Sequence, residues 1–340
     1  MRPRQGPAAP GAGRASAGRW LLRLFGLTLM LGAFSLPLLR TPDRSVETLV
    51  ARWAPPPSQF MDLQGQLVHY RDEGPRDDAE PLLLLHGTSA SLHTWEGWAR
   101  ALRGQRRVIS LDLPAYGLTG PWAGPFVGQP YTAEAYTGFV LQVLDKLAVK
   151  RFVAIGNSLG GEVAWRLAQR APERVTRLVL VDASGYRFEP GSLPMAWRLA
   201  RVPLLSGLIE QLMARPLIVQ GLSTVMADPR HITDTMVDRY VELTLREGNR
   251  HAFVQRARHW TPGEGVDKIS GLSLPTLILW GAMDRLIPPA LAQRFAADVP
   301  GSQVVVFDDL GHVPQEEDPL RSVAPVKAFL GWKAEAGRGS

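Results

Sequence analysis

The chain has 340 residues, 45% of them hydrophobic, which suits one globular core with an insertion or an appendage. It contains no cysteine, so disulfides, thiolate metal sites and a cysteine nucleophile are excluded. The formal net charge is +6, but the basic residues are scattered and form no run interleaved with aromatic residues. We therefore expect no nucleic-acid partner.

The N-terminal part has two sections of different composition. Residues 1–19 are rich in Ala, Gly, Pro and Arg, which predicts a disordered basic N-terminus. Residues 20–39 are mainly apolar and carry no charge apart from Arg23, and their length is at the short end for a bilayer core of about 30 Å. The basic residues before this segment favour a cytoplasmic N-terminus. We expect a transmembrane signal-anchor, a membrane as partner, and a following domain on the non-cytoplasmic side, which is the periplasmic face in a diderm bacterium.

Two other interpretations of residues 20–39 stay open. A cleavable signal peptide would be cut near Ala33-Phe34-Ser35. A buried helix of the folded domain is less favoured, because the segment precedes a predicted Pro-rich linker at 40–58. That linker contains Ala54-Pro55-Pro56-Pro57 and is expected to be stiff and extended.

From Gln59 onward, short apolar runs alternate with helical patterns. Residues 60–63 and 67–70 flank Gln64-Gly65-Gln66 and predict a hairpin. Continuous apolar runs predict strands buried on both faces at 81–86, 108–111, 152–155, 178–181, 277–280 and 304–307. Helical patterns lie at 95–102, 133–147, 160–169, 290–297 and 320–330. The alternation predicts an α/β fold over 59–183 and 263–334, with a mostly parallel central sheet and helices on both faces.

Residues 184–262 interrupt this alternation. They contain no strand pattern, only helical segments separated by prolines, and they predict a helical lid inserted on top of the sheet. Many of the residues in the first half of this insertion are apolar: Met195, Trp197, Leu199, Val202, Leu204, Leu205, Leu208 and Ile209. They can pack the lid onto the sheet, line an apolar acyl pocket, or do both.

Two glycine-containing turns follow predicted strands. Gly156-Asn157-Ser158-Leu159-Gly160 matches G-x-S-x-G between a strand and a helix, where a tight turn lifts the serine clear of the sheet. Ser158 is therefore the candidate nucleophile, and the helix N-terminus favours negative charge beside it. Gly87 follows an earlier strand, and we expect the backbone N–H groups of Thr88 and Leu159 to hold an oxyanion. His86 is expected to brace this loop.

A serine hydroxyl needs a base to take its proton and a carboxylate to orient that base. His312 and Asp284 each follow a predicted strand, so both belong at the same edge of the sheet as the serine. Asp182, after its own strand, is the alternative acid, and His259 of the insertion is a rival histidine. This chemistry requires no metal and no organic cofactor.

These motifs together resemble the α/β-hydrolase superfamily, in the branch of small esterases and lipases, C–C bond hydrolases and cofactor-free haloperoxidases. The resemblance covers about residues 59–330 and rests on five motifs: His86-Gly87, 112–117, 156–161, 280–284 and Gly311-His312. It implies the chain order serine, acid, histidine, which both aspartates satisfy; some relatives place the acid at the position of Asp182, but the place of Asp284 within the ordered motif set favours Asp284. The loop that holds Asp112 is structural in this family, and Ala115 stands where the family usually has glycine.

The resemblance implies a serine hydrolase that cleaves a carboxylic ester with an apolar acyl or alkyl group through an acyl-enzyme. Ser158 argues against dehalogenases and epoxide hydrolases, which carry aspartate at the elbow. A C–C bond hydrolase of the meta-cleavage-product type is second, because residues 88–93 lack the glycine-rich stretch expected of that class. A non-catalytic membrane-associated scaffold of this fold is a further alternative. It would usually have lost one member of the triad, and all three are present.

Overall fold

The computed structural model describes residues 18–28, 30, 40–188, 193–212 and 215–332. It divides into two compact units, residues 1–41 and 42–340. In the first unit, residues 18–28 are helical. None of the helices within the described ranges has the length and apolar character needed to cross a bilayer. Most of the expected disordered segment (1–17) and residues 29 and 31–39 of the expected anchor lie outside the described residues.

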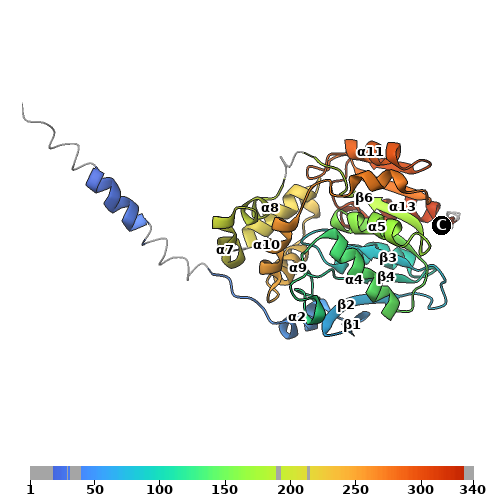
Figure 1. Cartoon of the computed structure of the whole chain (residues 1–340), viewed down its shortest axis with the longest axis horizontal. Coiled ribbons are helices and arrows are strands. Elements are labelled where there is room, and N and C mark those ends of the chain that lie inside the picture. Colours follow the sequence, from blue (N-terminus) through green and yellow to red (C-terminus); the bar gives the residue numbers. More distant parts are fainter. Residues whose placement is uncertain (1–17, 29, 31–39, 189–192, 213–214, 333–340) are drawn as a thin grey trace, which may run out of the picture. The chain divides into compact units, whose positions relative to one another are not determined.

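The second unit is built on one eight-stranded sheet, with the order β1-β2-β4-β3-β5-β6-β7-β8 (Figure 1). β1 pairs antiparallel with β2, β2 pairs antiparallel with β4, and the remaining pairs are parallel. The strands are β1 Ser58–Leu63, β2 Gln66–Glu73, β3 Leu82–Leu85, β4 Val108–Leu111, β5 Phe152–Asn157, β6 Val175–Val181, β7 Thr276–Gly281 and β8 Gln303–Phe307. The predicted α/β-hydrolase fold with a mostly parallel sheet is confirmed.

Helices cover both faces of this sheet. They are α3 Glu96–Leu102, α4 Ala133–Lys146, α5 Leu159–Arg170, α11 Ala290–Asp298, α12 Pro314–Glu317 and α13 Pro319–Phe329. Short 3-10 turns lie at Leu92–Trp95, Gly124–Phe126, Pro229–His231 and Val266–Gly271. The side chains of β3 alternate between two apolar clusters: Leu83 and Leu85 face Trp165 of α5, and Leu82 and Leu84 face Trp98 of α3. Burial on both faces explains why these strands are continuous apolar runs.

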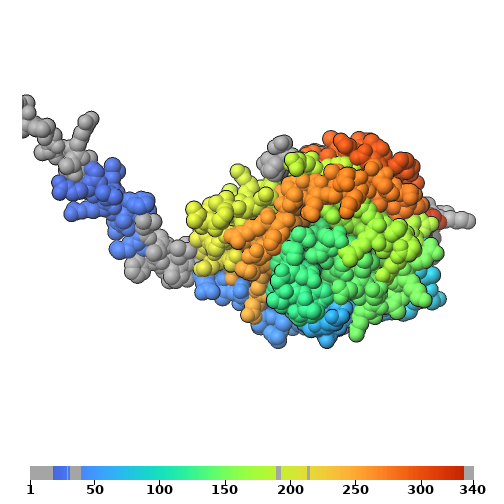
Figure 2. Space-filling model, in the orientation of Figure 1, coloured from blue at the N-terminus to red at the C-terminus, as the bar shows by residue number. Residues whose placement is uncertain are grey.

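The predicted helical insertion lies between β6 and β7. Its helices are α6 Met195–Ala200, α7 Pro203–Leu212, α8 Arg215–Val225, α9 Asp234–Thr244 and α10 Asn249–His259. Helices α6, α7, α8 and α10 share a small apolar cluster of their own, which includes Trp197, Ile209 and Phe253. Figure 2 shows these helices, yellow to light orange, packed beside the green helices of the core. We call the insertion the lid.

The predicted linker at 40–58 is wrong in part, because it contains helix α2 (Val46–Trp53). Apolar residues recur along this segment at the spacing of one helical face, and that face is buried at Leu49 and Trp53. It packs against Leu118 of the core and Leu243 of α9. The prediction of an extended linker gave too much weight to the three prolines that follow.

Candidate active site

Ser158 lies at the turn between β5 and α5. Its backbone has φ 55° and ψ −116°, a left-handed conformation that is unusual for a residue with a side chain and is typical of a functional turn. The two flanking glycines are required by space. A Cβ on Gly156 would lie 2.1 Å from the carbonyl oxygen of Gly160, and a Cβ on Gly160 would lie 2.0 Å from the carbonyl oxygen of Leu85.

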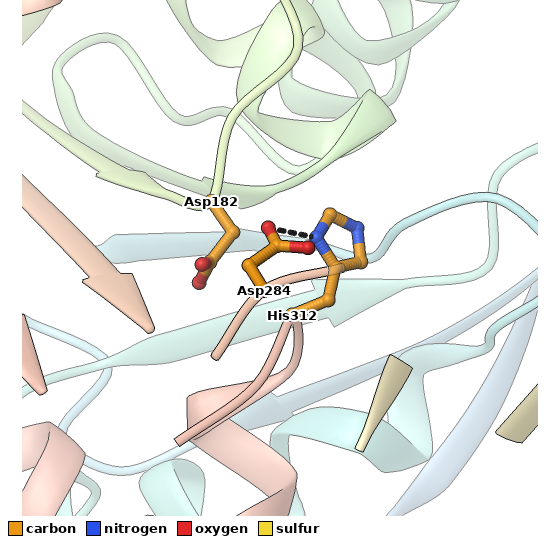
Figure 3. A group of neighbouring side chains, drawn as sticks. All are labelled: Asp182, Asp284 and His312. Carbon is orange, nitrogen blue, oxygen red and sulfur yellow. Dashed lines mark hydrogen bonds and ion pairs between the residues drawn. The ribbon is translucent and has the colours of Figure 1, made fainter. Parts of the chain in front are cut away.

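His312 and Asp284 are brought together at the carboxyl ends of β8 and β7. The Nδ1 of His312 lies 2.7 Å from Oδ2 of Asp284, and both side chains are almost completely buried (Figure 3). The other oxygen of Asp284 accepts hydrogen bonds from the backbone N–H groups of Leu286 (2.7 Å) and Ile287 (3.0 Å). With Nδ1–H donating to Asp284, Nε2 of His312 carries the free lone pair. Nε2 is buried and has no hydrogen-bond partner among the described residues.

Asn157, which the sequence analysis did not single out, joins the serine turn to the histidine loop. Its side-chain amide donates to the backbone carbonyl of His312 at 2.9 Å and to that of Val181 at 3.1 Å. The residue immediately before the serine therefore fixes the position of the histidine. Only the long-range contact shows this role, because the sequence gives Asn157 merely as the variable residue of the G-x-S-x-G motif.

Asp182, the alternative acid, lies beside this pair but makes a different bond. Figure 3 shows its side chain next to that of Asp284. The Oδ1 of Asp182 accepts from the backbone N–H of Gly281 at 2.9 Å, while its Oδ2 is buried without a hydrogen-bond partner among the described residues. Burial, and then the negative charge of Asp284, hold the pKa of Asp182 well above its usual range. Asp182 is thus favoured as a neutral carboxylic acid, while Asp284 bonds the histidine.

Asp182, Asp284 and His312 form the one group within the described ranges whose spacing would suit a metal ion, with ligand atoms within 4.8 Å of one another. The hydrogen bond between His312 and Asp284 already occupies two of the three ligands. The raised pKa of Asp182 disfavours the ionised form that a metal ion requires. The donor set therefore fits a hydrogen-bonded acid–base pair better than a metal centre.

Ser158 and His312 line one cavity between the sheet and the lid, with about 1080 Å³ of empty space including its opening. Thr88 and Leu159, the predicted oxyanion residues, line it as well. The lid contributes mainly apolar side chains: Leu193, Trp197, Leu217, Ile218, Leu222, Phe253 and Trp260. Two polar lid residues, Tyr240 and Arg256, also line the cavity, and the sequence analysis named neither of them.

The other candidate residues, His86, His259 and Asp112, bond backbone groups of neighbouring segments. His86 bonds the carbonyl of its neighbour Gly87 through Nδ1 and accepts from the N–H of Leu113 through Nε2, so it braces the loop as expected. His259 accepts from the N–H of Tyr131 and does not line the cavity. Asp112 is buried and accepts from the N–H groups of two loops and from His69, which agrees with a structural role.

Comparisons with known proteins agree with this geometry. The family model described as "alpha/beta hydrolase fold" matches residues 80–319, so the chain belongs to this family of hydrolases. An uncharacterized hydrolase of Bacillus subtilis, YugF, is 27% identical over 74% of this chain and 88% of its own length. The 2-hydroxymuconate semialdehyde hydrolase of Pseudomonas sp. CF600 is 28% identical over 74% of this chain and 86% of its own.

Among solved structures, a membrane phospholipase A described as a bacterial virulence factor aligns with a TM-score of 0.66. The alignment covers 92% of this chain and 98% of that one at 24% identity, and it shows a shared fold.

Proposed function

We propose that the chain hydrolyses carboxylic esters with an apolar acyl or alkyl group, with Ser158 as nucleophile, His312 as base and Asp284 as the orienting acid. One observation carries the proposal. The free Nε2 of His312 and the strained serine turn face the same largely apolar cavity, while Asp284 holds the opposite side of the imidazole. No other described histidine combines a carboxylate partner with a place in that cavity.

The reaction follows from this arrangement. The Oγ of Ser158 attacks the ester carbonyl as Nε2 of His312 takes its proton, and Asp284 stabilises the resulting imidazolium. The backbone N–H groups of Thr88 and Leu159 hold the oxyanion at the N-terminus of α5. His312 then protonates the leaving alcohol, and a water molecule attacks the acyl-enzyme by the same route to release the acid.

The experiment uses the full chain in detergent, a fluorophosphonate probe and nitrophenyl esters of increasing acyl length. We expect labelling and turnover in the wild type, and a loss of about 10⁴-fold or more in kcat for Ser158→Ala. Ser184→Ala is the matched control, because Ser184 lines the same cavity without lying on the turn, and it should still be labelled. Absence of labelling in a folded wild type would contradict the proposal and favour a scaffold.

Cleavage of a C–C bond is the second candidate, and the relatives that act as 2-hydroxymuconate semialdehyde hydrolase and 2-hydroxy-6-oxononadienedioate hydrolase favour it. The same preparation should be tested with 2-hydroxymuconate semialdehyde, whose yellow colour fades on cleavage. Turnover of this compound at a kcat/KM above that of every ester would replace the ester proposal. Short-chain phospholipids belong in the ester panel, since one structural neighbour is a phospholipase A.

We further propose that residues 20–39 anchor the chain in a membrane, with the catalytic domain on the non-cytoplasmic side. The support is the apolar sequence preceded by arginines. We expect the full chain to stay in carbonate-washed membranes. We also expect a protease to reach the catalytic domain only from the non-cytoplasmic side. A chain found wholly in the carbonate wash would overturn this placement.

A further inference from the structure

One buried arginine in the lid has no counter-charge bonded to it. Arg256 lies on α10, is 3% exposed, and lines the cavity that contains Ser158 and His312. Among the described residues it makes no hydrogen bond and no ion pair, and its Nε is buried without a partner. A buried charge costs several kcal/mol unless it is paired, so this position calls for an explanation.

Three other arginines are buried to a similar degree, and each has a carboxylate partner. Arg71 pairs with Glu96 at 2.7 Å, Arg166 with Glu162 at 3.1 Å, and Arg250 with Asp43 at 2.6 Å. The fold thus pairs its buried guanidinium groups elsewhere. Arg256 differs from them in facing a cavity, where a bound molecule can supply the missing anion.

Glu162 is the acid on which the charge of Arg256 acts, but among the described residues no carboxylate lies within ion-pair distance of Arg256. Burial raises the pKa of Glu162, and the positive charges of Arg256 and Arg166 both oppose that rise. The guanidinium of Arg256 therefore attracts the Glu162 carboxylate electrostatically. The ion pair of Glu162 is nevertheless with Arg166. The ring of Trp197 lies 6.0 Å from the guanidinium carbon, at the outer limit of a cation–π contact.

We propose that Arg256 binds a singly charged oxyanion, a carboxylate or a phosphodiester, on the same molecule whose ester is cleaved at Ser158. The inference rests on the proposed function and narrows its substrate class to esters that carry one negative charge as well as an apolar acyl or alkyl part. A guanidinium offers a planar fork of N–H donors that matches both oxyanions, and the apolar lid strengthens the attraction by excluding water. One cation favours one negative charge.

The test compares matched pairs of substrates with the full-length protein. The first pair is nitrophenyl hexanoate and the mono-nitrophenyl ester of adipate, which adds a terminal carboxylate. The second is dihexanoylglycerol and dihexanoylphosphatidylmethanol, which adds a phosphodiester without a cation. We expect the wild type to prefer the charged member of one pair. The pair that shows the preference identifies the oxyanion.

In Arg256→Met we expect the ratio of kcat/KM for the charged over the neutral substrate to fall by about 10- to 100-fold. Arg256→Lys should recover part of the ratio, because it restores the charge but not the fork. Arg201→Met is the matched control. Arg201 stacks on Trp260, with its guanidinium carbon 5.2 Å from the ring centroid, but it is exposed and does not line the cavity. The ratio of kcat/KM for the charged over the neutral substrate should therefore stay at the wild-type value.

Two results would overturn the inference while leaving the ester proposal intact. One is a folded Arg256→Met whose ratio equals that of the wild type in both pairs. The other is a wild type that prefers the neutral member of both pairs, a measurement that does not depend on the variant folding. If the wild type cleaves none of the four esters, or Ser158→Ala cleaves them equally well, the proposed function itself has failed.

Discussion

The floor and the lid of the cavity are built in different ways. In the floor, a Cβ added to Gly156, Gly160 or Gly281 would lie 2.0–2.1 Å from a backbone oxygen. In the lid, a Cβ on Gly207 or Gly221 would meet nothing within 4 Å. The floor is therefore confined to one geometry at these turns, whereas α7 and α8 of the lid have space for a side chain at Gly207 and Gly221. Ser158, His312 and Asp284 are thus held by the ends of the strands, and we expect the lid helices to determine which substrate fits the cavity.

The largest effect is expected at the floor, where two neighbouring aspartates should differ sharply. Asp284→Asn places an NH2 donor against Nδ1 of His312, because the other oxygen is held by two backbone N–H groups. It should lower kcat by about 10⁴-fold, because the imidazole is then held in the wrong tautomer. Asp182→Asn should lower kcat by less than about tenfold, because Asp182 already favours its neutral form. Steady-state kinetics of the two folded variants measures both losses of kcat. A larger loss in Asp182→Asn than in Asp284→Asn would make Asp182 the catalytic acid.

The next effect concerns stability. Gly160→Ala should cost more than about 3 kcal/mol of unfolding free energy, since its methyl group would collide with the backbone of Leu85. Gly207→Ala, in the middle of α7, should instead add about 0.5–1 kcal/mol by the higher helix propensity of alanine. Urea unfolding of both variants provides the measurement. Equal costs at the two sites would show that the lid is as tightly constrained as the floor.

The lid should control acyl length. Gly221 lines the cavity from α8, so Gly221→Leu fills part of the space and should lower kcat/KM for dodecanoate relative to butyrate by about tenfold. Gly207→Leu, on an exposed position of α7 that does not line the cavity, is the control and should leave the profile unchanged. The nitrophenyl ester series measures both. An unchanged profile in Gly221→Leu would place the acyl chain elsewhere.

The smallest effect is a pH dependence of stability at Asp182. Burial and the charge of Asp284 raise the folded-state pKa of Asp182. The contribution of Asp182 to the free energy of unfolding is therefore fully present below the ordinary carboxyl pKa, and it is lost as the pH rises through the folded-state pKa. Asp182→Asn lacks this loss and should melt higher than the wild type by about 2–4 °C at pH 8, where roughly 1 kcal/mol gives such a shift. The gain should shrink toward pH 5 in thermal unfolding. A gain that grows on acidification would contradict the direction of the pKa shift.

Features that depend on local sequence could be predicted, and long-range ones could not. The strand, glycine turn and helix around Ser158 can be predicted because their signals lie in adjacent residues. The mostly parallel sheet agrees with the alternation of strand and helix patterns along the chain. Sequence alone chooses between Asp182 and Asp284 by motif position, since both follow strands. The structure separates them by their bonds, because Asp284 bonds His312 whereas Asp182 bonds the backbone of Gly281.

The bridging role of Asn157 and the unpaired charge of Arg256 had no sequence signal. Arg256 lies in a helix with four other basic residues, Arg250, His251, Arg258 and His259, and no periodicity tells which of them is buried beside the cavity. Helix α2 did have a signal in the spacing of its apolar residues, but the prolines that follow obscured it.

Helix α2 also determines where the chain can be shortened for protein production. Glu242 of the lid is 9% exposed and bonds Arg44 (2.8 Å), Arg52 (2.8 Å) and Trp53 (2.6 Å), all of which precede the prolines. A version begun at Ala54 would strip this carboxylate of its partners and uncover the apolar patch at Leu118 and Leu243. A soluble version should therefore begin no later than Pro42, or aggregation will be mistaken for a property of the enzyme.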